Sequence, residues 1–331
     1  MAHQIDTTSL NRASYASTQR EWHGLGELMP AGQDIETWAQ AAGMEYKVQR
    51  AVVRFATQRL DPANALIPAQ VLQSIDDKLV LFRSDTGAPL GVVSDSYKVV
   101  QPREVLEFFR EWAQANACTI ESAGVLFGGK RYFATAKMSE GVFVDGAEGR
   151  DKIVPYVLLS TSADGSLATE GRITTVRVVC NNTLRLASKG ASSFRVSHRT
   201  AFKAEECRTI IESAHEEFGA FMDMSRKLAS IKVESRLAED MTTLLLTTPT
   251  RDADAARDSA GFTRIMSLFQ GGGKGSTLES SRETAWGWLN SATEFVDHHV
   301  RARSDENRTA AALWGPGADL KQRALDIALA A

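Results

Sequence analysis

The spacing of hydrophobic positions along the chain changes near residue 200. In the first 200 residues, short runs alternate between apolar and polar side chains, which is the spacing of a strand with one buried face. From residue 201 on, apolar residues recur every three or four positions, as in an amphipathic helix. We therefore expect an α+β protein, with a sheet domain over residues 1–200 and a helical region over residues 201–331 that packs on it or mediates assembly.

Three hairpins account for most of the predicted sheet. Their turns fall at residues 85–87 (Asp-Thr-Gly), 128–129 (Gly-Gly) and 164–165 (Asp-Gly), and Asp-Gly is among the strongest two-residue turn signals. A further short strand is predicted over residues 194–199. Strands that are joined by hairpins, without alternating strands and helices, indicate an antiparallel sheet.

Helices are predicted on both sides of the change in spacing. A short one over residues 34–44 has Asp34 at its N-cap, and one over residues 101–116 opens with Pro102, a favoured first helical residue. The apolar stripe of the second helix predicts that it covers the sheet. In the second half of the chain, helices are predicted over residues 201–231, 234–246, 261–270, 281–299 and 318–330.

One stretch of the chain has a charge that the rest does not share. The hydrophobic content of 43% and the charged content of 24% are ordinary for a globular protein, and the net charge is −3. Residues 171–203 contain seven Lys or Arg and no Asp or Glu, which leaves −10 for the remainder. We expect this segment, the basic strip, to attract an anionic partner.

Strand alternation gives the basic strip an apolar side and a polar side. Arg195, Ser197 and Arg199 share one side of their strand and are expected to face outward. Thr175 and Arg177 are expected to do the same on the preceding strand. Arg and Ser contact phosphate oxygens without distinguishing bases. The residues predicted to contact nucleic acid are Arg172, Arg177, Arg185, Lys189, Arg195, Ser197, Arg199, Lys203 and, outside the strip, Lys274.

Motifs that suggest enzyme or metal chemistry each have a better structural interpretation. Cys180 and His198 fall on the apolar sides of different strands, so a buried thiol and a core histidine are favoured over a nucleophile and its base. The Gly-Gly-Gly-Lys-Gly-Ser segment at 271–276 lacks the residue order of a phosphate-binding loop, although its lysine remains a candidate phosphate contact. Glu294 and His298 share a helical face but have no third ligand. We therefore predict a non-enzymatic protein with no catalytic residue, metal or cofactor.

The spacing of the cysteines and the hydropathy of the chain indicate where in the cell the protein is expected. The three cysteines are widely spaced and form no metal-ligand or disulfide pattern, which is typical of reduced thiols. The N-terminal segment is polar and lacks the apolar core of a signal peptide, and no apolar run approaches the roughly 18 residues of a membrane span. We therefore expect a protein of the host-cell cytoplasm with no membrane association.

Several motifs spread over the chain resemble one family. They are WHGLG at 22–26, SDTGAPLGVVSDSYKVVQPREVLEFF at 84–109, SADGSLAT at 162–169, TTVRVVCNNTL at 174–184, RVSHR at 195–199, GGGKG at 271–275, TAWGWLNSATEFVDHH at 284–299 and ENR at 306–308. With these motifs the chain is similar to the phage/plasmid-like protein family of unknown function, DUF family 932. The resemblance implies an accessory protein of a phage, plasmid or integrative element, which favours DNA handling without naming a catalytic residue.

The function that we favour is sequence-independent DNA binding, with single strands preferred, for strand annealing in recombination or replication. Annealing needs neutralised phosphates and exposed bases but no catalytic residue, and annealing proteins typically form homo-oligomers. Three alternatives stay open, one of them an enzyme such as a nuclease or a nucleotide-processing protein. The basic strip could bind an acidic protein, as in an anti-defence factor or a replication regulator of a mobile element. Its Arg groups could also pair with acidic helices of the same chain.

Overall fold

The structure is a computed structural model that describes most of the chain. The described residues are 15–17, 27–30, 32–59, 69–116, 119–145, 150–177, 182–185, 193–203 and 214–331. All strands of this described part lie before residue 197, and its helices after that point form a helical half. The α+β class predicted from the sequence is therefore confirmed.

A nine-stranded sheet, the large sheet, is the largest single element of the fold. Its strands are β1 (Tyr15–Ser17), β2 (Glu27–Leu28), β6 (Thr119–Leu126), β7 (Arg131–Lys137), β8 (Val142–Phe143), β9 (Lys152–Ser162), β10 (Thr169–Arg177), β11 (Asn182–Arg185) and β12 (Phe194–Val196). The order is β11-β10-β9-β7-β6-β1-β2, with β12 beside β10 and β8 beside β9. All neighbours are antiparallel except β1 and β2, and the hairpins predicted at 128–129 and 164–165 are confirmed.

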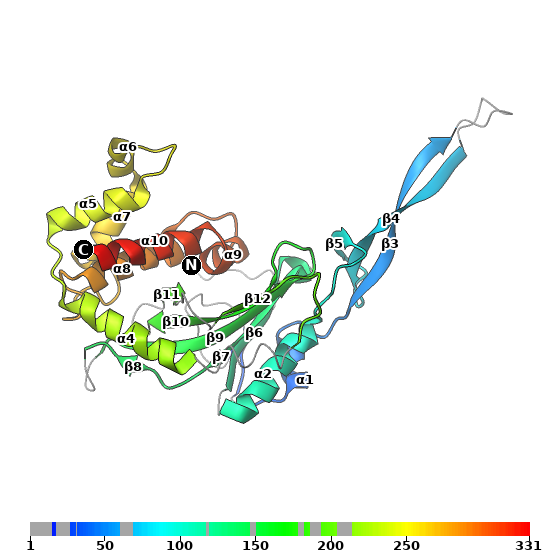
Figure 1. The fold of residues 1–331 in the computed structure, drawn as a ribbon, viewed down its shortest axis with the longest axis horizontal. Coiled ribbons are helices and arrows are strands. Elements are labelled where there is room, and N and C mark those ends of the chain that lie inside the picture. The colour runs from blue at the N-terminus through cyan, green and yellow to red at the C-terminus, as the bar shows by residue number, and fades with distance from the viewer. Residues whose placement is uncertain are drawn as a thin grey trace.

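A second, three-stranded sheet, the small sheet, stands at the edge of the large one (Figure 1). It consists of β3 (Val48–Arg59), β4 (Ala69–Arg83) and β5 (Pro89–Ser94). The hairpin predicted at 85–87 joins β4 to β5, and Gly87 takes the positive φ of 69° that this turn needs. Gly91 of β5 lies so close to the turn after β9 that a Cβ on it would be 2.7 Å from the Cα of Asp164. The two sheets therefore meet through a close backbone contact that requires glycine.

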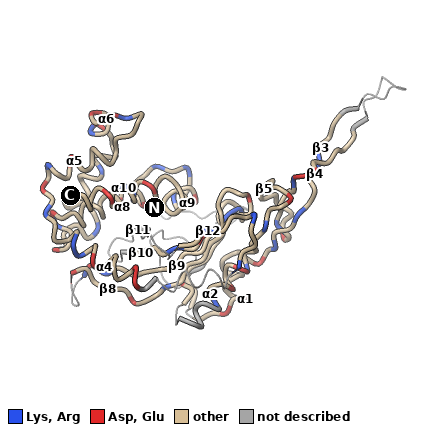
Figure 2. The backbone as a smooth tube through the Cα atoms, in the orientation of Figure 1, with Lys and Arg blue, Asp and Glu red and all other residues tan. Residues whose placement is uncertain are grey.

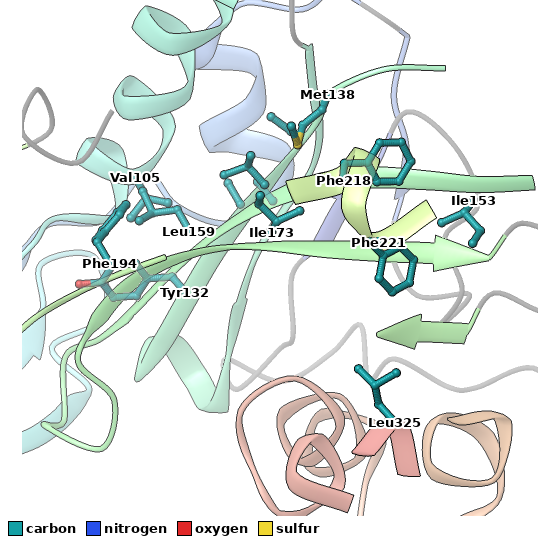
Figure 3. Packing of buried hydrophobic residues seen from close by; sticks show 14 of the residues in the cluster. Val105, Tyr132, Met138, Ile153, Leu159, Ile173, Phe194, Phe218, Phe221 and Leu325 are labelled. Carbon is teal, nitrogen blue, oxygen red and sulfur yellow. The ribbon is translucent and has the colours of Figure 1, made fainter. Parts of the chain in front are cut away.

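Two helices cover one face of the large sheet. They are α1 (Ile35–Ala41), whose N-cap Asp34 accepts a hydrogen bond from the first turn as predicted, and α2 (Pro102–Asn116). Figure 3 shows Val105 of α2 beside Leu159 of β9 in the main core, and both are buried. The predicted role of residues 101–116 as a covering helix is confirmed.

The helical half contains seven helices and two single π-turns within the described residues. They are α4 (Ala214–Ser230), α5 (Ser235–Leu246), α6 (Ala253–Arg257), α7 (Ala260–Ser267), η2 (Leu268–Gly272), α8 (Ala285–Glu294), η3 (Phe295–His299), α9 (Asp305–Trp314) and α10 (Pro316–Ala330). The expected helix start at residue 201 is wrong, because residues 201–203 are not helical. The helices α6 and α9 were not predicted, since their short sequences carry no strong apolar stripe.

The helix α9 covers the second face of the large sheet. Its last residue, Trp314, lies with its ring centroid 5.9 Å from that of Phe133 and donates its indole N–H to Ser160 Oγ at 2.9 Å. Leu313 and Trp314 pack on a separate apolar cluster that includes Leu158 of β9. The central strands are thus covered on both faces, which removes the exposed side that an alternating strand would otherwise have.

Buried polar contacts join the helical half to the segment before β9 and also link helices within the helical half. Asp151, which is fully buried, accepts hydrogen bonds from Ser280 Oγ at 2.7 Å and from the indole N–H of Trp286 at 2.9 Å. Lys321 of α10 forms an ion pair at 2.7 Å with Asp297, and both side chains are buried. Each contact satisfies a buried charge that would otherwise be costly.

Candidate nucleic-acid interface

An open cleft lies where the small sheet meets the edge of the large one. Its walls are β5, the turn between β9 and β10, and β12 with the residues that follow it, and its volume is about 630 Å³. Three of the residues predicted to contact nucleic acid line it, namely Arg195, Ser197 and Arg199. The fold therefore brings this part of the basic strip to a concave surface.

The strand β12 ends at Val196, three residues short of the strand predicted over residues 194–199, but the predicted alternation of buried and exposed side chains continues to Arg199. Phe194 is buried, and its ring fits against β10 because the residue opposite is Gly171, where a Cβ would lie 2.2 Å from the ring. Arg195, Ser197 and Arg199 are all exposed. These three side chains form one polar series along the cleft, which we call the basic row.

A stacked pair of rings supports the basic row from beneath. His198 lies with its ring centroid 4.3 Å from that of Tyr97, and its Nδ1 and Nε2 lie 2.9 and 3.0 Å from the carbonyl oxygens of Lys98 and Leu167. Tyr97 donates its hydroxyl proton to the Ser162 carbonyl at 2.8 Å, and burial raises the pKa of this phenol to about 12. His198 is therefore a buried structural residue, as predicted, and it fixes the backbone between Ser197 and Arg199.

The charge of the cleft is mainly positive. Arg195 and Arg199 form no ion pair within the described part of the chain, and Glu170, which lies opposite Arg195 in the ladder between β10 and β12, pairs with Arg172 at 3.2 Å. Among the described lining residues Asp164 is the one acid, and its Oδ1 already accepts the Ser166 N–H at 2.9 Å. Arg131 lies nearby and donates its Nε–H to Ser166 Oγ at 3.0 Å. An anion entering the cleft would thus meet two unpaired guanidinium groups and several hydroxyls.

The structure corrects the interpretation of β10. Thr175 is buried rather than outward-facing, since it lies on the same side of β10 as Ile173, which belongs to the main core. Arg172 is also buried, with 6% of its surface exposed. It forms an ion pair with Glu170 at 3.2 Å and donates a hydrogen bond to the Leu313 carbonyl, so it ties α9 to the sheet. Arg172 therefore does not belong to the nucleic-acid contacts.

The remaining residues of the basic strip are not brought to the cleft by the described structure. The backbones of Arg177 and Arg185 lie in the ladder between β10 and β11, where Arg177 pairs with Asn182. Lys189 lies outside the described residues, as does Cys180. Lys203 is exposed and follows the basic row along the chain, but it does not line the cleft.

The glycine loop that carries Lys274 binds a carboxylate of the protein itself. The backbone N–H of Lys274 donates to both oxygens of Glu294, at 3.0 Å to Oε2 and 3.3 Å to Oε1, and Glu294 is buried. Ser276 Oγ donates to the carbonyl of Gly273 at 2.6 Å. This amide therefore holds Glu294 and is not available to a phosphate, which agrees with rejecting a phosphate-binding loop. The Lys274 side chain is exposed, but away from the cleft lining.

The histidines that follow Glu294 do not form a metal centre with their neighbours. Asp297 is held by Lys321, and desolvation, followed by nearby cations of which Arg264 is the foremost, lowers the pKa of His299. Across the described ranges, no group of three or more His, Cys, Asp or Glu side chains is arranged to hold a metal ion. In the same part of the chain, no helix combines the length and apolarity needed to cross a bilayer.

Comparison with known proteins gives one match. A family model with the description "Domain of unknown function (DUF932)" matches residues 89–314, a segment that includes the basic row and the helical half except α10. No curated protein and no solved structure matches the chain.

Sequence reasoning identified the basic row but not the walls that make it a cleft. Tyr97 and Asp164 were visible only as parts of a loop and of a hairpin turn, and nothing local in the sequence links them to Arg195. Gly91 is the one residue of the sequence that could have indicated the cleft, because its lack of a side chain allows the close contact with the turn at Asp164. This contact is apparent only in the folded structure.

Proposed function

The chain belongs to the DUF932 family, whose domain has no assigned function, and we propose that it binds single-stranded DNA without sequence preference through the basic row. One observation carries the proposal. Arg195 on β12, and Ser197 and Arg199 in the segment that follows it, are exposed and line the cleft, and the two arginines have no ion pair within the described chain. An open cleft with two unpaired guanidinium groups supports an anionic ligand rather than an apolar one.

The chemistry of the row fits a phosphodiester backbone. A guanidinium donates two parallel N–H bonds to phosphate oxygens, and a serine hydroxyl adds a third donor without distinguishing bases. Tyr97 is the one Tyr, Phe or Trp residue among the described residues that line the cleft. Its ring is buried against His198, so it supplies no platform for base stacking. Contacts confined to phosphates make the proposed binding independent of sequence.

The size of the cleft favours a single strand. Its volume of about 630 Å³ lies in the range of pockets that hold one small ligand. A DNA duplex is a much larger ligand, because its two backbones are separated by grooves about 6 and 12 Å wide. A few nucleotides of a single strand, with the bases left outside, fit this space and remain free to pair with a second strand.

We assign this binding to strand annealing in the recombination or replication of a mobile element, in the cytoplasm of the host cell. Support comes from the resemblance to phage and plasmid proteins and from the phosphate-directed chemistry of the row. Binding of this kind needs no catalytic group. His198, the lining residue best suited to acid–base chemistry, is held between two backbone carbonyls.

Fluorescence anisotropy of a labelled oligothymidylate tests the proposal. The wild-type chain is expected to bind at low salt, and the R195A/R199A variant to bind about 100-fold more weakly or worse, because it loses two charge-assisted hydrogen bonds of about 1.5 kcal/mol or more each. R236A is the matched control, since Arg236 on α5 is likewise exposed and without an ion pair in the described chain.

Two outcomes would overturn the assignment. If the wild-type chain does not bind the oligonucleotide at low salt, single-strand binding is excluded. If it instead binds polyglutamate, and R195A/R199A abolishes that binding, the basic row serves an acidic protein partner, as in an anti-defence factor or replication regulator.

A further inference from the structure

The strands β3 and β4 extend far beyond the small sheet. β5 pairs with β4 only from Lys78 to Phe82. Beyond a bulge at Val52/Val53, β3 and β4 pair only with each other, from Val53 opposite Ile75 to Arg59 opposite Ala69. Figure 1 shows this two-stranded segment, which we call the ribbon (residues 53–59 and 69–75), projecting away from the rest of the molecule.

The ribbon exposes apolar side chains that the rest of the protein keeps inside. Of the eleven large apolar side chains that are exposed in the described chain, four lie on the ribbon and a fifth, Val52, lies at its base. Leu72 is 67% exposed and Phe55 is 45% exposed. By alternation, Phe55 shares one face with Val53, Val71 and Ile75, so this face is an apolar stripe. Such a patch on one projecting element is typical of an interaction surface.

The ribbon also has two strand edges without a partner. At the start of β3, the side chain of Gln101 forms the hydrogen bonds that a neighbouring strand would form. Its oxygen accepts from the N–H of Val48 at 2.8 Å, and its amide nitrogen donates to the carbonyl of Val48 at 3.2 Å. Within the described structure, no strand or side chain does the same for the edges along residues 53–57 and 71–75. A two-stranded ribbon is marginally stable alone, and free edges pair readily with a further strand.

The charges of the ribbon select the partner. The sequence of the ribbon contains two cations, Arg54 and Arg59, and no acid, and Figure 2 shows few charged residues on its described part. The two edges differ: β3 carries Arg54 and Arg59, whereas β4 has no cation over residues 69–75 and carries the exposed Asp76 and Asp77 in the bulge.

Arg54 and Asp76 lie at nearly the same position along the length of the ribbon, on its two opposite edges. Arg54 pairs with Ser74, and Asp76 follows Ile75 by one residue. Neither Arg54 nor Asp76 has an ion pair within the described chain. If two molecules stand side by side with their ribbons pointing the same way, β3 of one runs antiparallel to β4 of the next, and Arg54 comes within two positions of the neighbour's Asp76.

We propose that copies of this chain assemble head to tail through the ribbon, with the β3 edge of one copy paired to the β4 edge of the next. The pairing extends the ribbon into a continuous antiparallel sheet, joins the apolar stripes, and sets the free Arg54 against the free Asp76. Because the two edges are different surfaces, the assembly closes into a ring or grows into a filament. The assembly does not depend on nucleic-acid binding.

Size-exclusion chromatography with light scattering, without nucleic acid, tests the proposal through charge reversal. The wild-type chain is expected to form oligomers that grow with concentration. R54D and D76R each place like charges at every contact and raise the dissociation constant about fivefold, since a cross-strand charge pair contributes roughly 0.2–1 kcal/mol in either direction. The double variant R54D/D76R, and also an equal mixture of the two single variants, restore assembly, because opposite charges then meet again.

A matched pair of variants separates assembly from folding. Phe55→Asp places a charge in the apolar stripe, where Phe55 is 45% exposed, and yields monomers, whereas Leu329→Asp on α10, where the leucine is 47% exposed, leaves the size unchanged. Circular dichroism confirms that both variants fold. A wild-type chain that stays monomeric at all concentrations, or single charge variants that keep the wild-type size, would overturn the proposal.

Discussion

The contact at Gly91 gives a prediction whose size can be worked from the structure. In Gly91→Ala, the added Cβ would lie 2.7 Å from the Cα and 2.9 Å from the Cβ of Asp164. Because carbon atoms pack at about 3.5 Å or more, the turn at Asp164 must move by roughly 0.8 Å. Overpacking of this kind costs about 1–3 kcal/mol, and the lower chain entropy of alanine offsets about 0.4–1 kcal/mol of it. The net loss of stability is therefore about 0.5–2 kcal/mol.

Urea denaturation followed by circular dichroism measures this loss. The same substitution at Gly219 of α4 is the control, because nothing lies within 4 Å of the Cβ that it would add. Gly219→Ala is expected to stabilise the protein by about 0.5–1 kcal/mol, since alanine is the better helix former. Opposite signs for the two substitutions support the account. A Gly91→Ala variant as stable as the wild type would refute the close contact between the two sheets.

Three further predictions concern polar groups that are buried or half-buried. Trp286→Phe removes one of the donors to the buried Asp151 and should cost about 1–3 kcal/mol in urea denaturation. Lys321→Met removes the ammonium group that pairs with the buried Asp297 and should cost about 3–5 kcal/mol, seen as a lower melting temperature. Burial raises the pKa of Glu306, so the folded state holds its proton longer than the unfolded chain does. The free energy of unfolding should therefore fall as pH rises from about 4.5 through the raised pKa, and in Glu306→Gln this pH dependence should be smaller; equal slopes in both proteins would contradict it.

Local patterns predicted the local structure. The turns at 85–87, 128–129 and 164–165, the N-cap at Asp34 and the alternation of β12 all depend on residues within a few positions of one another, and all are confirmed.

Long-range packing decided what the sequence did not predict. Arg172 looked like part of an exposed basic face, but α9, which lies more than 130 residues later, covers that face and accepts its hydrogen bond at Leu313. The projecting two-stranded ribbon was not predicted for a similar reason. The alternation of β3 continues smoothly, whereas the bulge at residues 76–78 and the short reach of β5 are set by strand pairing. Likewise, nothing near Lys274 in the sequence indicates that Glu294 binds its amide.

The salt dependence of oligothymidylate binding tests the central claim most directly. A single strand releases about 0.7 counterions per neutralised phosphate, so log affinity should fall linearly with log salt concentration, and the slope should be smaller by about 1.4 in R195A/R199A. R236A should keep the wild-type slope. Affinity that does not change with salt, or a slope in R195A/R199A equal to that of the wild type, would contradict phosphate binding by the basic row.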